Sequence, residues 1–383
     1  MTTFEFATAG RIVFGGGCSA SVPVWAASHG PRALVVTGRT PARAEWLVEA
    51  LQHQGAEVAL LCVDGEPDLA FVSGGAELAR RRSIDVVIGV GGGSAIDAAK
   101  AIAVLATNQG TPIDYLEVVG AGKALVNASL PLIALPTTAG TGSEVTRNAV
   151  LTVRDRRVKA SLRSPLMLPR IAVVDPVLTY DLPPLVTAAT GLDALTQLIE
   201  PFLSVRANVL TDALCRDGIA RVARSLERAC LDGHDAAARA DMSLASLFGG
   251  IALANAGLGA VHGLAAPIGG MCHAPHGAVC ASLLPHVMAA NVRALRGRPG
   301  AEAALARAAE VGRLLSGRED ADAAVEWLRG TVERLHLPRL AELGVSPADL
   351  PAIAGQAQHS SSMKGNPVAL SVDQLVAILE AAS

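Results

Sequence analysis

Short apolar runs alternate with helical segments through the first half of the chain, and this alternation constrains the fold more than any other feature. The runs do not alternate with polar residues, which predicts strands buried on both faces of a parallel sheet. They occupy residues 33–37, 58–62, 85–89, 131–135 and 171–175. The helical segments lie at 42–54, 70–82 and 94–106. A repeated strand–helix–strand order predicts a doubly wound α/β domain.

The pattern changes near residue 176. Between Pro184 and Ser383 the sequence offers no convincing strand, only Ala- and Leu-rich segments with helical periodicity. The clearest of these segments are 206–228, 238–266, 301–315 and 322–335. We therefore predict two domains, an α/β domain at 1–180 and an all-α domain at 181–383.

The composition excludes several classes of protein. With 51% hydrophobic and 17% charged residues, the chain can bury large cores, which excludes a disordered protein. A net charge of −3 argues against a nucleic-acid partner. The six cysteines indicate buried thiols of a reducing compartment, and the N-terminus lacks the pattern of a signal peptide, so we expect a cytoplasmic protein. Residues 242–292 contain no Asp, Glu, Lys or Arg, but their glycines, prolines and histidines predict buried helices around a site and no membrane span.

Two turns rich in glycine and hydroxyl residues follow predicted strands. The first is 91–94 (GGGS), which leads into a helix, and the second is 136–144 (PTTAGTGSE). Glycines at a strand-to-helix turn let the backbone approach a ligand, and the free N–H groups of the helix suit a pyrophosphate. The spacing is not that of the Gly-x-Gly-x-x-Gly fingerprint, and each turn alone also fits an ordinary tight loop. Together the two turns predict nucleotide binding.

Four polar residues of the second half have the chemistry of a metal site. Asp193 and Gln197 are four residues apart and share one helix face. His262 and His276 both lie in the uncharged stretch 242–292. A carboxylate, an amide oxygen and two imidazoles can bind one divalent cation. Buried histidines are also commonly hydrogen-bonded core residues, so both interpretations stay open at this point. Glu200, three residues past Gln197, has two interpretations: a residue that supports the metal ligands or, the preferred one, an ordinary carboxylate on the helix face.

Taken together, these motifs resemble the iron-containing (group III) alcohol dehydrogenases, a family that also includes the maleylacetate reductases. The resemblance runs over nearly the whole chain, from the segment RIVFG to the segment SMKGNP. The matching segments are 11–15, 91–94 with Asp97 and Lys100, 136–144, 257–262 (GLGAVH), 275–277 (PHG), 281–286 (ASLLPH) and 362–367.

The resemblance implies a Rossmann-like NAD(P)-binding domain and an all-helical metal and substrate domain, the fold of dehydroquinate synthase. It implies reversible hydride transfer between the nicotinamide and a small alcohol or aldehyde, with a metal as Lewis acid. Asp193, Gln197, His262 and His276 occupy the four metal-ligand positions, and Asp193, His262 and His276 are thereby implied to be catalytic. The residues implied to contact the dinucleotide are Gly92, Gly93, Ser94, Asp97, Thr137, Thr138, Thr141, Ser143, Lys159 and Leu178. A homodimer is also a family-level expectation.

The chain departs from the family pattern at three places. Gln197 stands where the family has a histidine, and its weaker amide donor predicts a lower affinity for Fe²⁺ or Zn²⁺. The site would then hold its metal more loosely, prefer a harder ion or work without one; Fe²⁺ is the expected metal, with Zn²⁺ and Mn²⁺ as alternatives. Ala266 replaces a histidine that relays protons in relatives, which leaves water, the ribose hydroxyl or His273 for that role. Gly38 and Arg39 stand where NAD-selective members carry an acid, so we predict that NADP(H) is accepted.

Three alternatives to an alcohol dehydrogenase remain. A metal-independent reductase of the maleylacetate type and a lyase of the dehydroquinate synthase type would both need cationic groups for their carboxylate substrates. Residues 242–292 supply only histidines. The third alternative is a nucleotide-binding regulatory protein whose catalytic site has decayed, with Gln197 and Ala266 as its signs.

Overall fold

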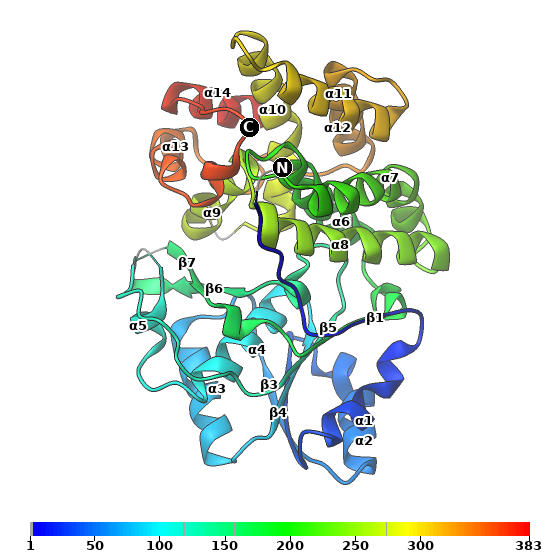
Figure 1. Cartoon of the computed structure of the whole chain (residues 1–383), viewed down its shortest axis with the longest axis vertical. Helices are drawn as coiled ribbons and strands as arrows, with labels where there is room; N and C mark the ends of the chain where they lie inside the picture. Colours follow the sequence, from blue (N-terminus) through cyan, green and yellow to red (C-terminus); the bar gives the residue numbers. More distant parts are fainter. Residues whose placement is uncertain (1–2, 118, 157, 273) are drawn as a thin grey trace. The chain divides into compact units, whose positions relative to one another are not determined.

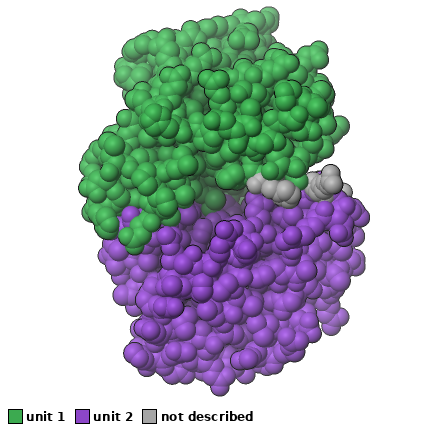
Figure 2. Space-filling model, turned by 180° about the vertical axis from the view of Figure 1, so that it is seen from behind, with its two compact units in different colours: residues 1–6, 139–141, 181–383 green, residues 7–138, 142–180 purple. Residues whose placement is uncertain are grey.

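The chain divides into two compact units, which Figure 2 shows in green and purple. The computed structural model describes residues 3–117, 119–156, 158–272 and 274–383. The sheet unit comprises Ala7–Thr138 and Gly142–Tyr180. The helical unit comprises Met1–Phe6, Ala139–Thr141 and Asp181–Ser383.

The sheet unit is built on a six-stranded parallel sheet with strand order β1-β8-β5-β4-β2-β3. Its strands are β1 (Ile12–Phe14), β2 (Arg32–Thr37), β3 (Glu57–Cys62), β4 (Val86–Gly91), β5 (Leu132–Pro136) and β8 (Ile171–Val174). The connecting helices are α1 (Val22–Ala27), α2 (Glu45–His53), α3 (Leu69–Arg81), α4 (Gly93–Leu105) and the short α5 (Pro112–Tyr115). The predicted doubly wound α/β class is confirmed.

Helices cover both faces of this sheet, as β2 demonstrates. Leu34 and Val36 are buried in one apolar cluster with α3 and α4, whereas Ala33 and Val35 are buried in another with α1 and α2. Figure 1 shows these two helix pairs on opposite sides of the strands. Side chains alternate across a strand, so a strand covered on both faces has no polar side, which explains its continuous apolar sequence.

The structure corrects the sequence-based picture at two places in this unit. β3, which was expected to be buried on both faces, is the edge strand of the sheet, and none of its residues is fully buried. The sequence analysis also passed over an antiparallel hairpin of β6 (Asn148–Val153) and β7 (Val158–Arg163). In β6 buried and half-buried residues alternate strictly, which is the period of a strand with one covered face.

The helical unit contains no strand among its described residues. Helices α6, α7 and α8 pack against one another, and α10 packs against α6, α9, α12 and α14 around one apolar core (Figure 1). α10 is long and apolar enough to span a membrane, but 72% of its most apolar window is buried inside the protein, as in a core helix. The helices are α6 (Pro184–Leu203), α7 (Val209–Leu231), α8 (Ala236–Ala256), α9 (Ala260–Cys272), α10 (His276–Arg296), α11 (Glu302–Ser316), α12 (Ala321–Arg334), α13 (Leu350–Gln358) and α14 (Val372–Ala382).

The single helix expected at 238–266 is wrong, because the chain breaks between α8 and α9 and turns by 99°. Gly257 takes a φ of 74°, a value that side chains rarely tolerate, and it closes α8 by donating its N–H to the carbonyl of Leu253. The break starts a new helix two residues before His262, and this start matters for the site described below.

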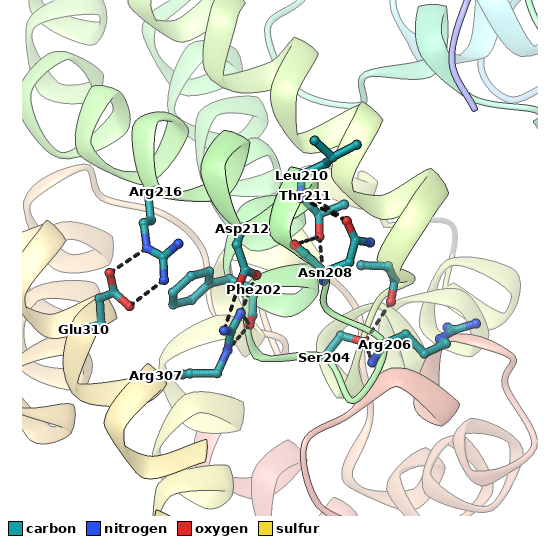
Figure 3. Close-up of polar contacts among 11 residues, drawn as sticks. Phe202, Ser204, Arg206, Asn208, Leu210, Thr211, Asp212, Arg216, Arg307 and Glu310 are labelled. Atoms are coloured by element: carbon teal, nitrogen blue, oxygen red, sulfur yellow. Dashed lines mark hydrogen bonds and ion pairs between the residues drawn. The ribbon is translucent and has the colours of Figure 1, made fainter. Parts of the chain in front are cut away.

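Two arginines fix the end of α6 to its neighbours (Figure 3). The guanidinium groups of Arg216 and Arg307 lie 5.1 and 4.2 Å from the centroid of the Phe202 ring. Arg307 also donates to the carbonyl of Phe202 and to both carboxylate oxygens of Asp212, and Arg216 forms two hydrogen bonds with Glu310. These contacts tie α6 to α7 and α11, so the helix that carries Asp193 and Gln197 is held at its C-terminal end.

Candidate active site

α6 supplies two buried polar side chains one turn apart. Asp193 is 1% exposed and Gln197 is 3% exposed, and both lie among apolar neighbours of the helical core. Their spacing places both side chains on one face of the helix. Oδ1 of Asp193 and Oε1 of Gln197 are buried and accept no hydrogen bond within the described part of the chain. Buried oxygens of this kind are rare in folded proteins and indicate a missing partner.

Glu200, one turn further along α6, orients His262. Its Oε2 lies 2.7 Å from Nδ1 of His262, and its Oε1 accepts the N–H of Val261 at 2.7 Å. A carboxylate at Nδ1 keeps the proton on that nitrogen and leaves the lone pair of Nε2 available. Nε2 lies 3.5 Å from Oδ1 of Asp193. The expectation that Glu200 is an ordinary carboxylate on the helix face is therefore wrong, since it is 6% exposed and positions a site residue.

His276, the first residue of α10, completes the cluster. Its Nε2 lies 3.7 Å from Oδ1 of Asp193, and the two imidazole rings are 5.4 Å apart between centroids. The His276 side chain is 37% exposed, in contrast to 8% for His262. The structure therefore brings together the carboxylate and both imidazoles that the sequence analysis singled out.

The sequence analysis missed Cys280 as a member of this cluster. Its Sγ lies 3.6 Å from Nε2 of His276. One potential ligand atom from each of Asp193, His262, His276 and Cys280 lies within 4.8 Å of the other three. Cys280 follows His276 by one helical turn, and this spacing is the signal that could have identified it.

The electrostatics of the cluster favour a cation. Burial alone would raise the pKa of Asp193, but the charge of His276 and the nearby side chains of His262 and Gln197 outweigh burial, so this pKa lies below its usual range. Burial acts to lower the pKa of His262, whereas the neighbouring carboxylates of Asp193 and Glu200 raise it to about 10. The two carboxylates thus hold positive charge in a buried place, and a divalent metal fits this donor set of oxygen, nitrogen and sulfur.

Asn366 supports the helix that carries His262. Its Oδ1 accepts the N–H of Ala260 at 3.1 Å, and its amide nitrogen donates to Oδ1 of Asn291 and to the carbonyl of Val368. The first N–H groups of a helix have no partner within it, and Asn366 satisfies one of them. The C-terminal segment 362–367 therefore fixes the start of α9.

The sheet unit brings the predicted cofactor turns together at one point. β2 and β4 are neighbours in the sheet, and the chain leaves them toward opposite sides, so their carboxyl ends form the topological switch point where such sheets bind ligands. A Cβ placed on Gly91 would lie 2.7 Å from Cβ of Ala95 and 3.5 Å from the backbone nitrogen of Gly38. Only glycine allows the ends of β2 and β4 and the start of α4 to approach this closely.

The first turn of α4 is arranged to receive an anion. Gly92 is the N-cap residue of α4, and its first turn, which includes Gly93 and Ser94, contains no acidic residue. Thr137 donates its backbone N–H to Gly91, and Thr138 packs beside Gly92. The N-terminus of the helix and the threonines that follow β5 thus lie together, which suits a pyrophosphate.

Asp97 and Ser143 are occupied by each other and by the protein. The Ser143 hydroxyl donates to Oδ1 of Asp97 at 2.5 Å, and Oδ2 of Asp97 accepts the N–H of Val150 at 2.9 Å. Nζ of Lys100 lies 3.0 Å from Asp97 and is fully buried. These contacts join α4 to β6, so Asp97 and Lys100 hold the N-terminal half of α4 in place.

The remaining predicted cofactor residues lie in different surroundings. Arg39 forms a 2.6 Å ion pair with Asp64, and both side chains are largely exposed. Lys159, on β7, lies 2.6 Å from Glu66, and Leu178 packs against the apolar cluster of α1 and α2. Thr141 belongs to the short segment Ala139–Thr141 of the helical unit.

Two positions, 266 and 273, were considered for proton relay, and at neither does the structure describe an ionisable side chain. Ala266, where relatives carry a histidine, is an exposed residue of α9. His273 lies outside the described residues.

Comparisons with known proteins give the class and the family of this chain. A parallel sheet with a glycine-rich turn before α4, and a helical unit whose Asp193, His262, His276 and Cys280 could hold a metal ion, are features of metal-associated dehydrogenases. The family model for iron-containing alcohol dehydrogenase matches residues 9–176, and the model for the C-terminal part of that family matches residues 187–383. The chain belongs to the iron-containing alcohol dehydrogenase family, and it is an oxidoreductase that acts on CH–OH donors.

Individual relatives extend over most or all of the chain. Alcohol dehydrogenase 4 of Saccharomyces cerevisiae is 40% identical over 87% of this chain and 85% of its own length. The crystal structure of a 1,3-propanediol oxidoreductase matches with a TM-score of 0.92 and 33% identity, covering 100% of both chains. A sulfoacetaldehyde reductase from Bifidobacterium kashiwanohense, solved in complex with NAD⁺, matches with a TM-score of 0.87 and 29% identity, covering 100% of this chain and 99% of that one.

Proposed function

We propose that this chain is an NAD(P)-dependent alcohol dehydrogenase or aldehyde reductase that uses a divalent metal held in the helical unit. One observation carries the proposal. Oδ1 of Asp193 is buried and accepts no hydrogen bond in the described structure, while imidazole nitrogens face it at 3.5 and 3.7 Å. A buried carboxylate oxygen surrounded by further donor atoms calls for a cation.

The residues of this cluster have separate tasks. Asp193, Gln197, His262 and His276 hold the cation, and Glu200 keeps Nε2 of His262 directed at it. The cation supplies Lewis acidity, which polarises the carbon–oxygen bond of the alcohol or aldehyde. Because the His276 side chain is 37% exposed, the cluster is more accessible on its side than on that of His262.

The dinucleotide binds to the sheet unit in this proposal. The N-terminus of α4 holds the pyrophosphate, and the relative from Bifidobacterium, solved with NAD⁺, supports a nicotinamide cofactor. The proposed contacts are Gly38, Arg39, Gly92, Gly93, Ser94, Asp97, Thr137, Thr138, Thr141, Ser143, Lys159 and Leu178. Arg39 offers a guanidinium to the 2′-phosphate of NADP(H), but Asp64 competes for it, so we expect both cofactors to be used.

Metal identity follows from the donor set. Fe²⁺ is the metal named by the family, and Zn²⁺ and Mn²⁺ suit imidazole and carboxylate donors as well. Because the amide of Gln197 is a weaker donor than the usual histidine, we propose that the metal is held loosely. We further propose a small neutral substrate, a homodimer and a cytoplasmic location; the six free cysteines support a reducing compartment.

The proposal is tested by following the reduced nicotinamide while the protein reduces a panel of aldehydes, keto acids and maleylacetate. The assay is run with NADH and with NADPH, before and after chelation, and after Fe²⁺, Zn²⁺ or Mn²⁺ is returned. We expect aldehyde reduction that is lost on chelation and restored by one metal. Reduction that ignores the chelator would instead favour a metal-independent reductase of the maleylacetate type, and nucleotide binding without any turnover would favour a regulatory protein.

A further inference from the structure

The geometry points to Cys280 as a direct ligand of the metal. Its thiolate would serve as the fourth ligand in place of the amide of Gln197, which is a weak donor. This inference rests on the proposed metal dependence, but it concerns a residue that the family's ligand pattern does not include. The site would then be held by Asp193, His262, His276 and Cys280.

Cys280 lies where a ligand is needed. It is the fifth residue of α10 and follows His276 by one turn, so the two side chains share a helix face. Its Sγ is 3.6 Å from Nε2 of His276, and the residue is 0% exposed. The thiol therefore lies between the cluster and the apolar core of the helical unit.

Three of the distances within the cluster are close to those of a tetrahedral site. With metal–nitrogen and metal–oxygen bonds of about 2.0 Å and a metal–sulfur bond of about 2.3 Å, tetrahedral ligand atoms lie about 3.3 Å apart for nitrogen and oxygen and about 3.5 Å apart for nitrogen and sulfur. The structure gives 3.5 and 3.7 Å for the two nitrogen–oxygen pairs and 3.6 Å for the nitrogen–sulfur pair.

The hydrogen bonding of two buried oxygens also indicates a cation at this cluster. Oδ1 of Asp193 and Oε1 of Gln197 are buried and accept no hydrogen bond within the described part of the chain. The side chain of Gln197 lies near Asp193, where it contributes to the lowered pKa of the carboxylate. Gln197 can therefore orient Asp193 while Cys280 completes the set of donors.

Metal binding at Cys280 exchanges a proton for the cation. The S–H bond breaks, its proton leaves to solvent, and the sulfur electron pair forms the bond to the metal, so one proton is released per thiolate bound. A thiolate, two imidazoles and a carboxylate suit Zn²⁺ and Co²⁺ better than Mn²⁺, which prefers oxygen ligands. The inference thus predicts that the site prefers Zn²⁺ and Co²⁺ over Mn²⁺ more strongly than a site of four nitrogen and oxygen donors would.

The test is a titration of the metal-free protein with Co²⁺, followed by near-ultraviolet absorption. We expect the intense thiolate-to-Co²⁺ charge-transfer band in the unmodified protein and in two controls, and its loss in Cys280→Ala. The controls are Cys215→Ala, which removes a cysteine equally buried in α7, and Cys62→Ala, which removes an exposed one. Loss of a direct ligand should also weaken Co²⁺ binding by about tenfold or more.

A second variant and a second measurement distinguish the loss of a ligand from a general disturbance of the site. In the double variant Cys280→Ala with Gln197→His, a histidine replaces the lost donor, so metal affinity should recover while the band stays absent. X-ray absorption of the unmodified Zn²⁺ protein needs no variant and should find one sulfur at about 2.3 Å from the metal. A shell of nitrogen and oxygen alone, or a band that persists in Cys280→Ala, would overturn the inference.

The outcome separates this inference from the proposed function. A metal bound without sulfur that still supports aldehyde reduction would remove Cys280 from the site and leave the function intact. A sulfur-bound metal in a protein that turns over no alcohol or aldehyde would do the opposite.

Discussion

At the scale of single residues, Glu200 decides which nitrogen of His262 is available to a metal. Its two carboxylate oxygens receive Nδ1 of His262 and the N–H of Val261, both at 2.7 Å. In Glu200→Gln the amide offers one acceptor oxygen, so it cannot satisfy both donors. We expect metal affinity to fall by about 10- to 100-fold. Competition with a coloured chelator measures this affinity, and an unchanged value in a correctly folded variant would show that Glu200 does not position His262.

The proposed choice of cofactor also depends on single residues, the ion pair of Arg39 and Asp64. The two side chains are 2.6 Å apart and largely exposed, so each can be replaced without disturbing the core. We expect Arg39→Ala to lower the preference for NADPH over NADH by about tenfold, which corresponds to about 1.4 kcal/mol. Asp64→Asn should change the preference in the opposite direction, because it releases the guanidinium.

The ratio of kcat/KM for the two cofactors, measured at one salt concentration, reports this preference. If both variants keep the ratio of the unmodified protein, Arg39 does not contact the 2′-phosphate.

At the scale of elements, the site depends on where α9 begins. Asn366 accepts the N–H of Ala260 and so holds the first turn of the helix that carries His262. Asn208 does the same for α7, where its Oδ1 accepts the N–H groups of Leu210 and Thr211 (Figure 3). Only one of these two helix starts carries a site residue.

This difference gives a matched pair of variants. Asn208→Ala should cost about 1 kcal/mol of stability, as the loss of a helix cap does. Asn366→Ala should cost more, because it also removes the hydrogen bonds to Asn291 and to the carbonyl of Val368. Asn366→Ala should also lower metal affinity by about tenfold, whereas Asn208→Ala should not change it. Urea unfolding and metal titration of both proteins provide the comparison. Equal metal affinities would show that the start of α9 does not affect metal binding.

At the scale of the whole molecule, the sheet unit contains a buried acid that makes its stability depend on pH. Burial raises the pKa of Glu144 from 4.5 to about 7, although Lys100 acts in the opposite direction. A folded pKa above the unfolded one means that the folded state binds the proton more tightly. The stability from Glu144 is therefore full below about pH 4.5 and is lost as the pH rises to about 7.

Glu144→Gln should remove this dependence. Between about pH 5 and pH 7, the free energy of unfolding of the variant should rise relative to that of the unmodified protein by about 1 kcal/mol per pH unit. Urea unfolding at a series of pH values tests this. Parallel pH profiles for the two proteins would mean that Glu144 titrates normally in the folded state.

How much of the molecule was predictable depends on how far apart the contributing residues lie in the sequence. The sheet and its turns follow from local patterns, since a buried parallel strand and a glycine turn each show within a few residues. The hairpin of β6 and β7 also has a local signal, the alternation in 148–153, but this signal is weaker than that of a continuous apolar run. The break at Gly257 has a signal as well, in the two glycines at 257 and 259.

The supporting residues of the site were not predictable in the same way. Asn366 gains its role only when α9, α10 and the C-terminal segment pack together, and its neighbours in sequence do not reveal this. Glu200 and Cys280 each follow a proposed ligand by about one helical turn, but only the packing of α6, α9 and α10 shows which atoms they contact. Asp193, Gln197, His262 and His276 could be proposed as ligands because their residue types suit a metal and because the chain resembles a known family.

The central claim is that this chain transfers hydride between a carbinol carbon and a nicotinamide with the help of a divalent metal. The most direct test incubates the metal-loaded protein with an oxidised nicotinamide cofactor and an alcohol deuterated at its carbinol carbon. Mass spectrometry then follows the label. We predict that deuterium appears in the reduced cofactor, and that this transfer is lost after chelation and in Asp193→Asn. Transfer that continues unchanged without metal, or a reduced cofactor that carries no label, would contradict the account.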